Sequence, residues 1–214
     1  MLQLTEHQQI VRFGRLLYEN RFIAGSEGNL SIRLSDGNIL ITPSGVGKGF
    51  LCEEDLVIVD SEGRQISGQG RASSELLMHL YVYNMRPEIK ACCHAHPPYT
   101  TAFSVAKKVL PSNILPEIIL SVGDIPLTEY ASPGTAEVPH ALEKYILEHT
   151  AFVLRSHGAL TIGRTAEEAY NRMEIVEHYA KIIYIAENAG KLNSLDAGEV
   201  KRLLRIRETL MTGK

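Results

Sequence analysis

Two histidines stand one residue apart in "ACCHAHPPYT" (91–100), directly after a short apolar run and just before two prolines. If the run is a strand, His94 and His96 lie on one face, because side chains two residues apart on a strand share a face. Neutral imidazole is a common ligand of zinc, and a catalytic zinc site uses three protein ligands and keeps one position open. The pair therefore predicts a divalent metal site that still needs a third ligand.

His157 is the candidate third ligand. It follows an apolar strand in "LRSHGALTIG", where Gly158 allows the backbone to turn tightly. Taken alone, His157 is better explained as a loop histidine bonded to the backbone, and a His-x-His pair also occurs by chance. Imidazole ligands suit zinc and other divalent transition metals alike. The prediction of Zn²⁺, or another divalent metal, therefore depends on all three histidines meeting.

Three segments of small residues are suited to binding an oxyanion: "GSEGNLS" (25–31), "TPSG" (42–45) and "ASSE" (72–75). They offer hydroxyls and backbone N–H groups, and the last opens a predicted helix, whose N-terminus favours an anion. Singly, the first two are more typical of hairpin turns and the third of a helix N-cap. Only together do they favour an anion site.

Three charged or titratable residues near these segments have two interpretations each. Glu75 is a general base if a metal lies nearby, or a carboxylate stabilised by the helix dipole or a capping box. Lys48, in "GVGKG", could add positive charge to a bound phosphate, although a solvated loop lysine is slightly favoured. His79 lies four residues after Glu75 on one helix face, where a surface ion pair explains it at least as well as metal ligation.

Apolar spacing indicates which elements must position these residues. Spacings of three and four predict helices, alternation predicts strands, and "SDG" (35–37) predicts a hairpin turn. Helices are predicted over 6–22, 71–85, 97–108, 135–149, onward from a cap at Thr165, and over 196–211. Strands are predicted over 30–34, 38–43, 55–60, 89–96, 151–156 and 158–163. Strands and helices mixed in this order predict one α/β domain covering residues 1–214.

Composition excludes several classes of protein. The 214 residues carry a formal net charge of −3 with no basic block, so neither nucleic acid nor an anionic membrane is an expected partner. No apolar run approaches the length of a membrane helix, and the N-terminal region lacks a signal-peptide centre. Cysteines are odd in number, and adjacent Cys92 and Cys93 point to opposite faces of a strand, so no disulfide framework is expected. We predict a cytoplasmic protein with reduced thiols.

Taken together, the motifs resemble the class II aldolase/adducin-head family, most closely its fuculose-1-phosphate aldolase branch, over nearly the whole chain. They follow the family's order: "GNLS" (28–31), "TPSG" (42–45), "SSE" (73–75), "HAHP" (94–97), "YASPGT" (130–135) and "HGAL" (157–160). The resemblance implies zinc held by His94, His96 and His157, with Glu75 as acid/base. It implies a phosphate site made by Asn29, Ser44, Gly45, Ser73 and Ser74. It also implies a largely antiparallel central sheet covered by helices, and a homotetramer with active sites between subunits.

The resemblance further implies reversible cleavage of a ketose 1-phosphate, such as L-fuculose 1-phosphate or a deoxypentulose 1-phosphate, to dihydroxyacetone phosphate and an aldehyde. One stretch departs: these aldolases usually carry a tyrosine, contributed across the subunit boundary, where this chain has Glu117 in "LPEIIL" (115–120). Methylthioribulose-1-phosphate dehydratases of the family use a glutamate in about this region, so Glu117 is a second catalytic candidate. Its structural alternative is a helix-start carboxylate beside Pro116.

Three other functions are open on the same scaffold. A methylthioribulose-1-phosphate dehydratase-like activity and a sugar-acid decarboxylase activity are the enzymatic alternatives. A non-catalytic binding module like an adducin head is disfavoured, because adducin heads generally lack the metal histidines and all three are present here.

Overall fold

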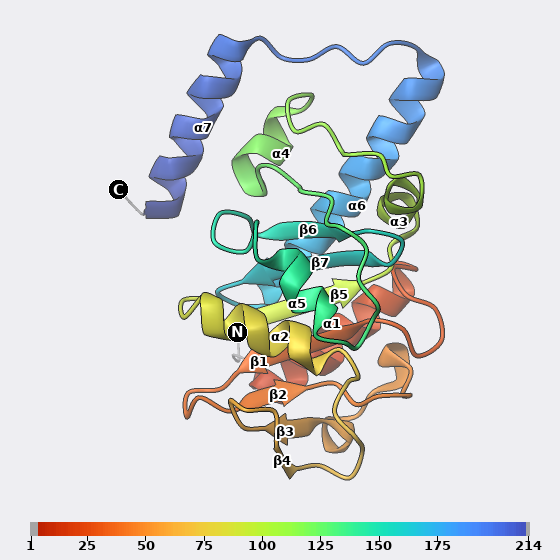
Figure 1. The fold of residues 1–214 in the computed structure, drawn as a ribbon, viewed down its shortest axis with the longest axis vertical. Coiled ribbons are helices and arrows are strands. Elements are labelled where there is room, and N and C mark those ends of the chain that lie inside the picture. The colour runs from red at the N-terminus through yellow and green to blue at the C-terminus, as the bar shows by residue number, and fades with distance from the viewer. Residues whose placement is uncertain (1–3, 213–214) are drawn as a thin grey trace.

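One seven-stranded antiparallel sheet organises the protein. The computed structural model describes residues 4–212. Its strands lie in the order β4-β3-β2-β1-β5-β7-β6, and every neighbouring pair is antiparallel (Figure 1). They are β1 (Asn29–Arg33), β2 (Ile39–Ile41), β3 (Val57–Val59), β4 (Gln65–Ser67), β5 (Ala91–Ala95), β6 (Ala151–Leu154) and β7 (Gly158–Gly163). The predicted single α/β domain with an antiparallel sheet is confirmed. Its extent over all of 1–214 stays a prediction, because 1–3 and 213–214 lie outside the described residues.

Helices cover both faces of this sheet. They are α1 (Glu6–Glu19), α2 (Leu76–Met85), α3 (Pro98–Val105), α4 (Pro116–Ser121), α5 (Glu137–Leu142), α6 (Ala166–Ala189) and α7 (Ala197–Thr212), with two short 3-10 helices at Lys48–Phe50 and Glu53–Asp55. In Figure 1, α2 and α5 lie in front of the sheet, and α1 and α6 lie behind it. The predicted cap of α6 is confirmed, since the Thr165 hydroxyl accepts a hydrogen bond of 3.0 Å from the Glu168 N–H. None of the helices in residues 4–212 is both long and apolar enough to cross a bilayer.

Strand alternation separates two hydrophobic cores. Cys92 packs into the core beneath α2 and α5, whereas Cys93 packs into the core beneath α1 and α6. The prediction that these adjacent thiols face opposite ways is confirmed, and neither they nor Cys52 form a disulfide. Because His94 lies two residues after Cys92, its side chain points to the α2 face. The sheet therefore directs the first histidine toward the N-terminus of α2.

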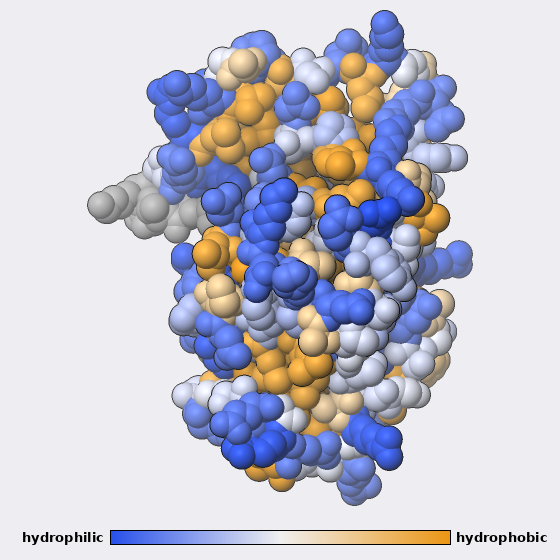
Figure 2. Space-filling view, viewed as in Figure 1, coloured by the Kyte–Doolittle hydropathy of each residue, from blue (hydrophilic) through white to orange (hydrophobic). Residues whose placement is uncertain are grey.

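A third core lies beyond β6, where α3, α4, α7 and the second half of α6 pack together. Figure 2 shows apolar surface gathered beside α7 and α4, in the upper part of the view. In this core the buried Glu177 carboxylate on α6 accepts hydrogen bonds from the Tyr99 and Thr100 N–H groups, at 2.9 and 2.8 Å. A side chain from another helix thus satisfies the free N–H groups at the start of α3, directly after the histidine pair.

Three elements differ from their predicted form, and the short helix α4 was considered only as the structural alternative for Glu117. The helix predicted to open at Ser73 or Ser74 begins at Leu76, because the Ser73 hydroxyl instead accepts from the Glu75 N–H and forms a turn. The helix predicted over 135–149 ends at Leu142 and continues as turns, which still bury Ile146 completely. Strand β4 was not predicted, since all three of its residues are exposed and give no apolar alternation.

Candidate metal centre and active site

Three imidazole rings converge at one end of β5 and β7. His94 is the fourth residue of β5, His96 follows that strand, and His157 lies in the turn between β6 and β7. The Nε2 atoms of His94 and His96 are 3.1 Å apart. The ring of His157 has its centroid 4.7 Å from that of His94 and 4.9 Å from that of His96. The structure therefore brings His157 beside a histidine pair that lies more than sixty positions earlier in the sequence.

Oxygen atoms beside His94 and His96 determine which ring nitrogen of each histidine can bind a metal. The Ala159 carbonyl accepts the Nδ1–H of His94 at 2.9 Å, so a neutral His94 presents an unprotonated Nε2. The Glu27 carboxylate lies 3.3 Å from Nδ1 of His96, which likewise leaves Nε2 of His96 as a lone pair. Two lone pairs facing each other at 3.1 Å repel unless a cation lies between them. Outer partners of this kind are typical of metal-binding histidines.

Burial keeps these rings neutral. Desolvation is the main cause that lowers the pKa of all three, and that of His157 falls to about 4, with the nearby His96 contributing. Neutral imidazole is the form that binds a metal. Zinc–nitrogen bonds of about 2.0–2.1 Å in a tetrahedral arrangement put ligand nitrogens roughly 3.3 Å apart, close to the separation seen here. The donor set fits a divalent transition metal.

Glu75 adjoins the same position. It is the N-cap residue of α2, and one carboxylate oxygen lies 3.0 Å from Nε2 of His94 and the other 3.6 Å from Nε2 of His157. Burial raises the pKa of Glu75 to about 7, while the Gly134 N–H and the Asn29 amide act in the opposite direction. Its buried Oε2 has no hydrogen-bond partner in the described residues. Such a carboxyl group can hold or release a proton near neutral pH.

An open cavity of about 400 Å³ lies beside the three histidines, within the usual range for small-molecule pockets. The five predicted phosphate ligands all line it: Asn29, Ser44, Gly45, Ser73 and Ser74. Gly45 has φ +76°, and no atom lies within 4 Å of the position that a Cβ would take. That open space lets a ligand approach the backbone of the loop. Their role in binding phosphate stays a prediction.

Lys48 is not the solvated loop lysine that the sequence slightly favoured. It is 2% exposed, and its ammonium donates hydrogen bonds to the carbonyls of Ser26 (2.7 Å) and Val46 (2.8 Å). Burial lowers the pKa of Lys48 to about 8. Because these two carbonyls belong to the two glycine-rich loops, Lys48 holds the loops together at the floor of the cavity.

His79 is not at the surface either. It is fully buried, and its ring nitrogens bond Asn29 and Ser31 of β1, so the predicted surface ion pair with Glu75 is wrong. Glu27, Lys48 and His79 were therefore the polar residues whose roles sequence reasoning missed. The one sequence signal for Glu27 was its place in "GSEGN" (25–29), two residues after Gly25 and directly before Gly28.

Gly158 is required for close approach rather than for an unusual backbone angle. A Cβ there would lie 2.4 Å from the Ala95 carbonyl oxygen and 2.6 Å from Cδ2 of His96. The left-handed residue of this turn is Ser156, with φ 54°. The predicted tight turn exists, but the glycine serves to let β7 pass close to the histidine pair.

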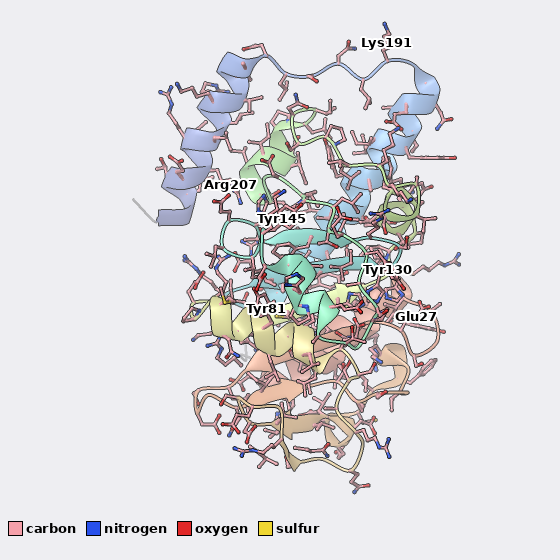
Figure 3. All side chains as sticks on the ribbon, in the orientation of Figure 1. Glu27, Tyr81, Tyr130, Tyr145, Lys191 and Arg207 are labelled. Atoms are coloured by element: carbon pink, nitrogen blue, oxygen red, sulfur yellow. The ribbon has the colours of Figure 1, made fainter. Side chains whose placement is uncertain are left out.

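Glu117 stands apart from the cavity within one chain. It is an exposed residue in the first turn of α4 and does not line the pocket. Tyr130 is 59% exposed; Figure 3 shows it on the same side of the molecule as Glu27, at the right of the view. Within residues 4–212 of one chain, none of the residues that line the pocket is a tyrosine. A catalytic role for Glu117 therefore requires a second subunit and stays a prediction.

Comparisons with known proteins point to one family. Residues 8–184 match the Class II Aldolase and Adducin N-terminal domain. The chain is 38% identical over 188 residues to the L-fuculose phosphate aldolase of Methanococcus maripaludis, covering 87% of this chain and 99% of that protein. It is 34% identical over 200 residues to the 3-oxo-tetronate 4-phosphate decarboxylase of Escherichia coli, covering 92% of this chain and 93% of that protein.

Solved structures with a similar fold point to the same family. One described as L-fuculose 1-phosphate aldolase has a TM-score of 0.88 at 31% identity, covering 97% of this chain and 98% of that one. YgbL from Escherichia coli has a TM-score of 0.86 at 33% identity, covering 92% and 97%. The match to the family model spans most of the chain, and the relatives align over nearly their full length. The chain belongs to the class II aldolase and adducin family and is a lyase-type enzyme of it.

Proposed function

We propose that this protein is a zinc-dependent aldolase that reversibly cleaves a ketose 1-phosphate to dihydroxyacetone phosphate and an aldehyde. One observation carries the proposal: three neutral imidazoles and a protonatable carboxyl group meet beside a cavity lined by glycine and serine loops. The three ring nitrogens would hold the metal, and the loops would hold the phosphate. Unpaired cysteines also support the predicted cytoplasmic location.

Each part of the site has a distinct task. Asn29, Ser44 and Ser73 would bind the phosphate and fix the ketose so that its carbonyl faces the histidines. A bound divalent cation would stabilise, as a Lewis acid, the negative charge that develops on the substrate's oxygens. Glu75 lies next to that position with a pKa raised to about 7 by burial, so it can deliver a proton to the substrate carbon at neutral pH.

Decarboxylation is the second candidate, because the stretch 115–120 has no tyrosine. When the C3–C4 bond of a ketose 1-phosphate breaks, the C4 hydroxyl must give up its proton, and this chain has Glu117 in the stretch where such aldolases usually carry the tyrosine that serves a neighbouring subunit. A 3-oxo-tetronate 4-phosphate loses its C1 carboxylate as CO₂, which needs no such transfer. The electron pair then forms the enediolate that aldol cleavage also forms. Protonation at carbon by Glu75 would give dihydroxyacetone phosphate in both cases.

We also propose that the enzyme is a homotetramer in which Glu117 completes the site of a neighbouring subunit. Its exposed position in the first turn of α4 supports this arrangement, as does the apolar surface gathered beside α4 and α7. Sedimentation velocity would measure the assembly. If the protein sediments as a monomer with full turnover, the intersubunit role of Glu117 is wrong.

The deciding experiment is a product assay over a panel of ketose 1-phosphates and 3-oxo-tetronate 4-phosphate. Coupling to glycerol-3-phosphate dehydrogenase consumes NADH when dihydroxyacetone phosphate appears, and separate measurements of aldehyde and CO₂ distinguish the two reactions. An aldolase yields aldehyde and no CO₂. Loss of water without dihydroxyacetone phosphate indicates a dehydratase. A protein without metal and indifferent to EDTA would favour a binding module.

Histidine variants provide the matched control for metal dependence. His96→Ala should abolish turnover. His140→Ala removes a histidine whose side chain is 82% exposed on α5, and it should leave turnover unchanged. Equal activity of the two variants would exclude the proposed metal centre.

A further inference from the structure

Four buried polar side chains form a continuous row behind the cavity. The Tyr83 hydroxyl lies 2.6 Å from the Ser31 hydroxyl, which lies 2.6 Å from Nδ1 of His79. Nε2 of His79 lies 2.5 Å from Oδ1 of Asn29. All four residues are at most 4% exposed, and only Asn29 reaches the cavity. We call this row, Tyr83–Ser31–His79–Asn29, the buried relay.

The Asn29 end of the relay determines which atom donates in each of its hydrogen bonds. An amide oxygen only accepts hydrogen bonds, so Nε2 of His79 must carry the proton and donate it to Asn29. Burial keeps His79 neutral, so its Nδ1 is then an acceptor. The Ser31 hydroxyl must therefore donate to Nδ1, and it receives the Tyr83 hydroxyl proton in turn. Every bond of the relay follows from the acceptor at Asn29.

We propose that His79 is a positioning residue that holds the Asn29 amide with its NH₂ group toward the cavity. The inference rests on the proposed function, in which Asn29 binds the phosphate of the substrate. With Oδ1 engaged by His79, only the two N–H donors of Asn29 are left for the cavity. A phosphate and the Glu75 carboxylate both need donors at that place.

The reverse orientation would oppose binding. A flipped Asn29 would direct its carbonyl oxygen at an anion, and Nε2 of His79 would have to accept rather than donate. The Tyr83 hydroxyl at the far end would then have to turn to the neighbouring Cys92 thiol, a weaker acceptor, since Ser31 would be donating toward it. The cavity's affinity for phosphate thus depends on a side chain that never touches the ligand.

The tautomer of His79 tests the relay without any substrate. Magic-angle spinning nitrogen-15 spectra of histidine-labelled protein distinguish protonated from unprotonated ring nitrogens, and the His79→Gln spectrum assigns the signals among the eight histidines. We expect a proton on Nε2 and none on Nδ1. A proton on Nδ1 overturns the inference, whatever reaction the enzyme catalyses.

Phosphate binding tests the consequence. The probe is inorganic phosphate, titrated calorimetrically into zinc-loaded protein. Gln at position 79 can still donate to Asn29, so His79→Gln should bind phosphate within about 3-fold of the wild type. His79→Leu removes the donor and should weaken binding by about 10- to 100-fold, the usual effect of losing a hydrogen bond to a charged group. Zinc content should be unchanged in both variants.

Tyr83→Phe is the matched control, because it shortens the relay at its far end and leaves the bond between His79 and Asn29. It should bind phosphate within about 3-fold of the wild type. If Tyr83→Phe and His79→Leu weaken phosphate binding equally, the loss comes from packing and the inference is wrong. Phosphate binding of wild-type affinity in His79→Leu would also overturn it.

If wild-type protein binds phosphate but cleaves no sugar phosphate, the proposed function fails and the positioning role stands. If it binds no phosphate, the phosphate site fails, and the tautomer still decides the orientation of Asn29.

Discussion

Burial of His79 leads to a quantitative prediction about stability in acid. The pKa of His79 is lowered by burial to about 3 in the folded protein, whereas an unfolded histidine has a pKa of about 6.5. Between these values the unfolded chain binds a proton and the folded chain does not. The free energy of unfolding therefore falls as the pH is lowered from about 6.5 toward 3.

The size of the effect follows from these two pKa values. At pH 5.5 the unfolded histidine is about nine-tenths protonated, so this one group lowers the free energy of unfolding by about 1.4 kcal/mol relative to pH 7.5. The result hardly depends on the folded value, as long as it lies below about 4.5.

Urea unfolding of wild type and His79→Gln at pH 7.5 and 5.5, both in EDTA, measures this contribution. EDTA is needed because metal binding is itself pH-dependent. The three histidines of the metal centre add the same dependence to both proteins, so the difference isolates His79. Wild type should lose about 1.4 kcal/mol more than the variant on acidification. His140→Gln, at a side chain 82% exposed, is the matched control and should behave as wild type. Parallel losses in wild type and His79→Gln would refute the reasoning.

Four other substitutions test the site. His96→Ala should reduce zinc, measured by elemental analysis, to below about a tenth of the wild-type content; normal content would remove His96 from the ligand set. Glu75→Gln should keep the zinc while kcat falls by about 10²–10⁴-fold, and unchanged turnover would exclude Glu75 as the acid/base. Gly158→Ala should weaken zinc binding at least about 10-fold by competition titration, because the new Cβ would lie 2.6 Å from Cδ2 of His96. Lys48→Met should lower the free energy of unfolding by roughly 2–4 kcal/mol in urea, since buried carbonyls lose their donor; a change below about 1 kcal/mol would contradict the bridging role.

The convergence of the histidines was partly predictable from sequence. His94 and His96 share a face because the strand period is two, and that is a local property. His157 was a candidate third ligand because it follows an apolar strand, but only the resemblance implied that it joins the other two, since pairing between β5 and β7 is set by contacts across the fold. The approach of His157 to the pair depends on Gly158, because a side chain there would collide with the backbone of Ala95 and the ring of His96.

Buried polar residues were the part that sequence could not predict. The spacing of His79 from Glu75 fits a surface ion pair, yet its partners are Asn29 and Ser31, about fifty residues earlier in the chain. Lys48 lies in a glycine-rich loop that suggests exposure, and its acceptors are backbone carbonyls that no residue type reveals. Whether a charged group is buried depends on which distant segments surround it, and periodicity carries no information about that.

Both borders of the sheet offer little edge to which another strand could add. At one border β4 has three residues, and the Gln65 amide turns back to the carbonyls of Gly68 and Gly70. At the other, the backbone at Pro126 and Thr128 already bonds Val153 of β6. Unpaired strand borders are what let copies of a β-protein join edge to edge. The short β4 and the occupied Val153 leave little edge for such joining, which helps to protect the sheet from runaway polymerisation.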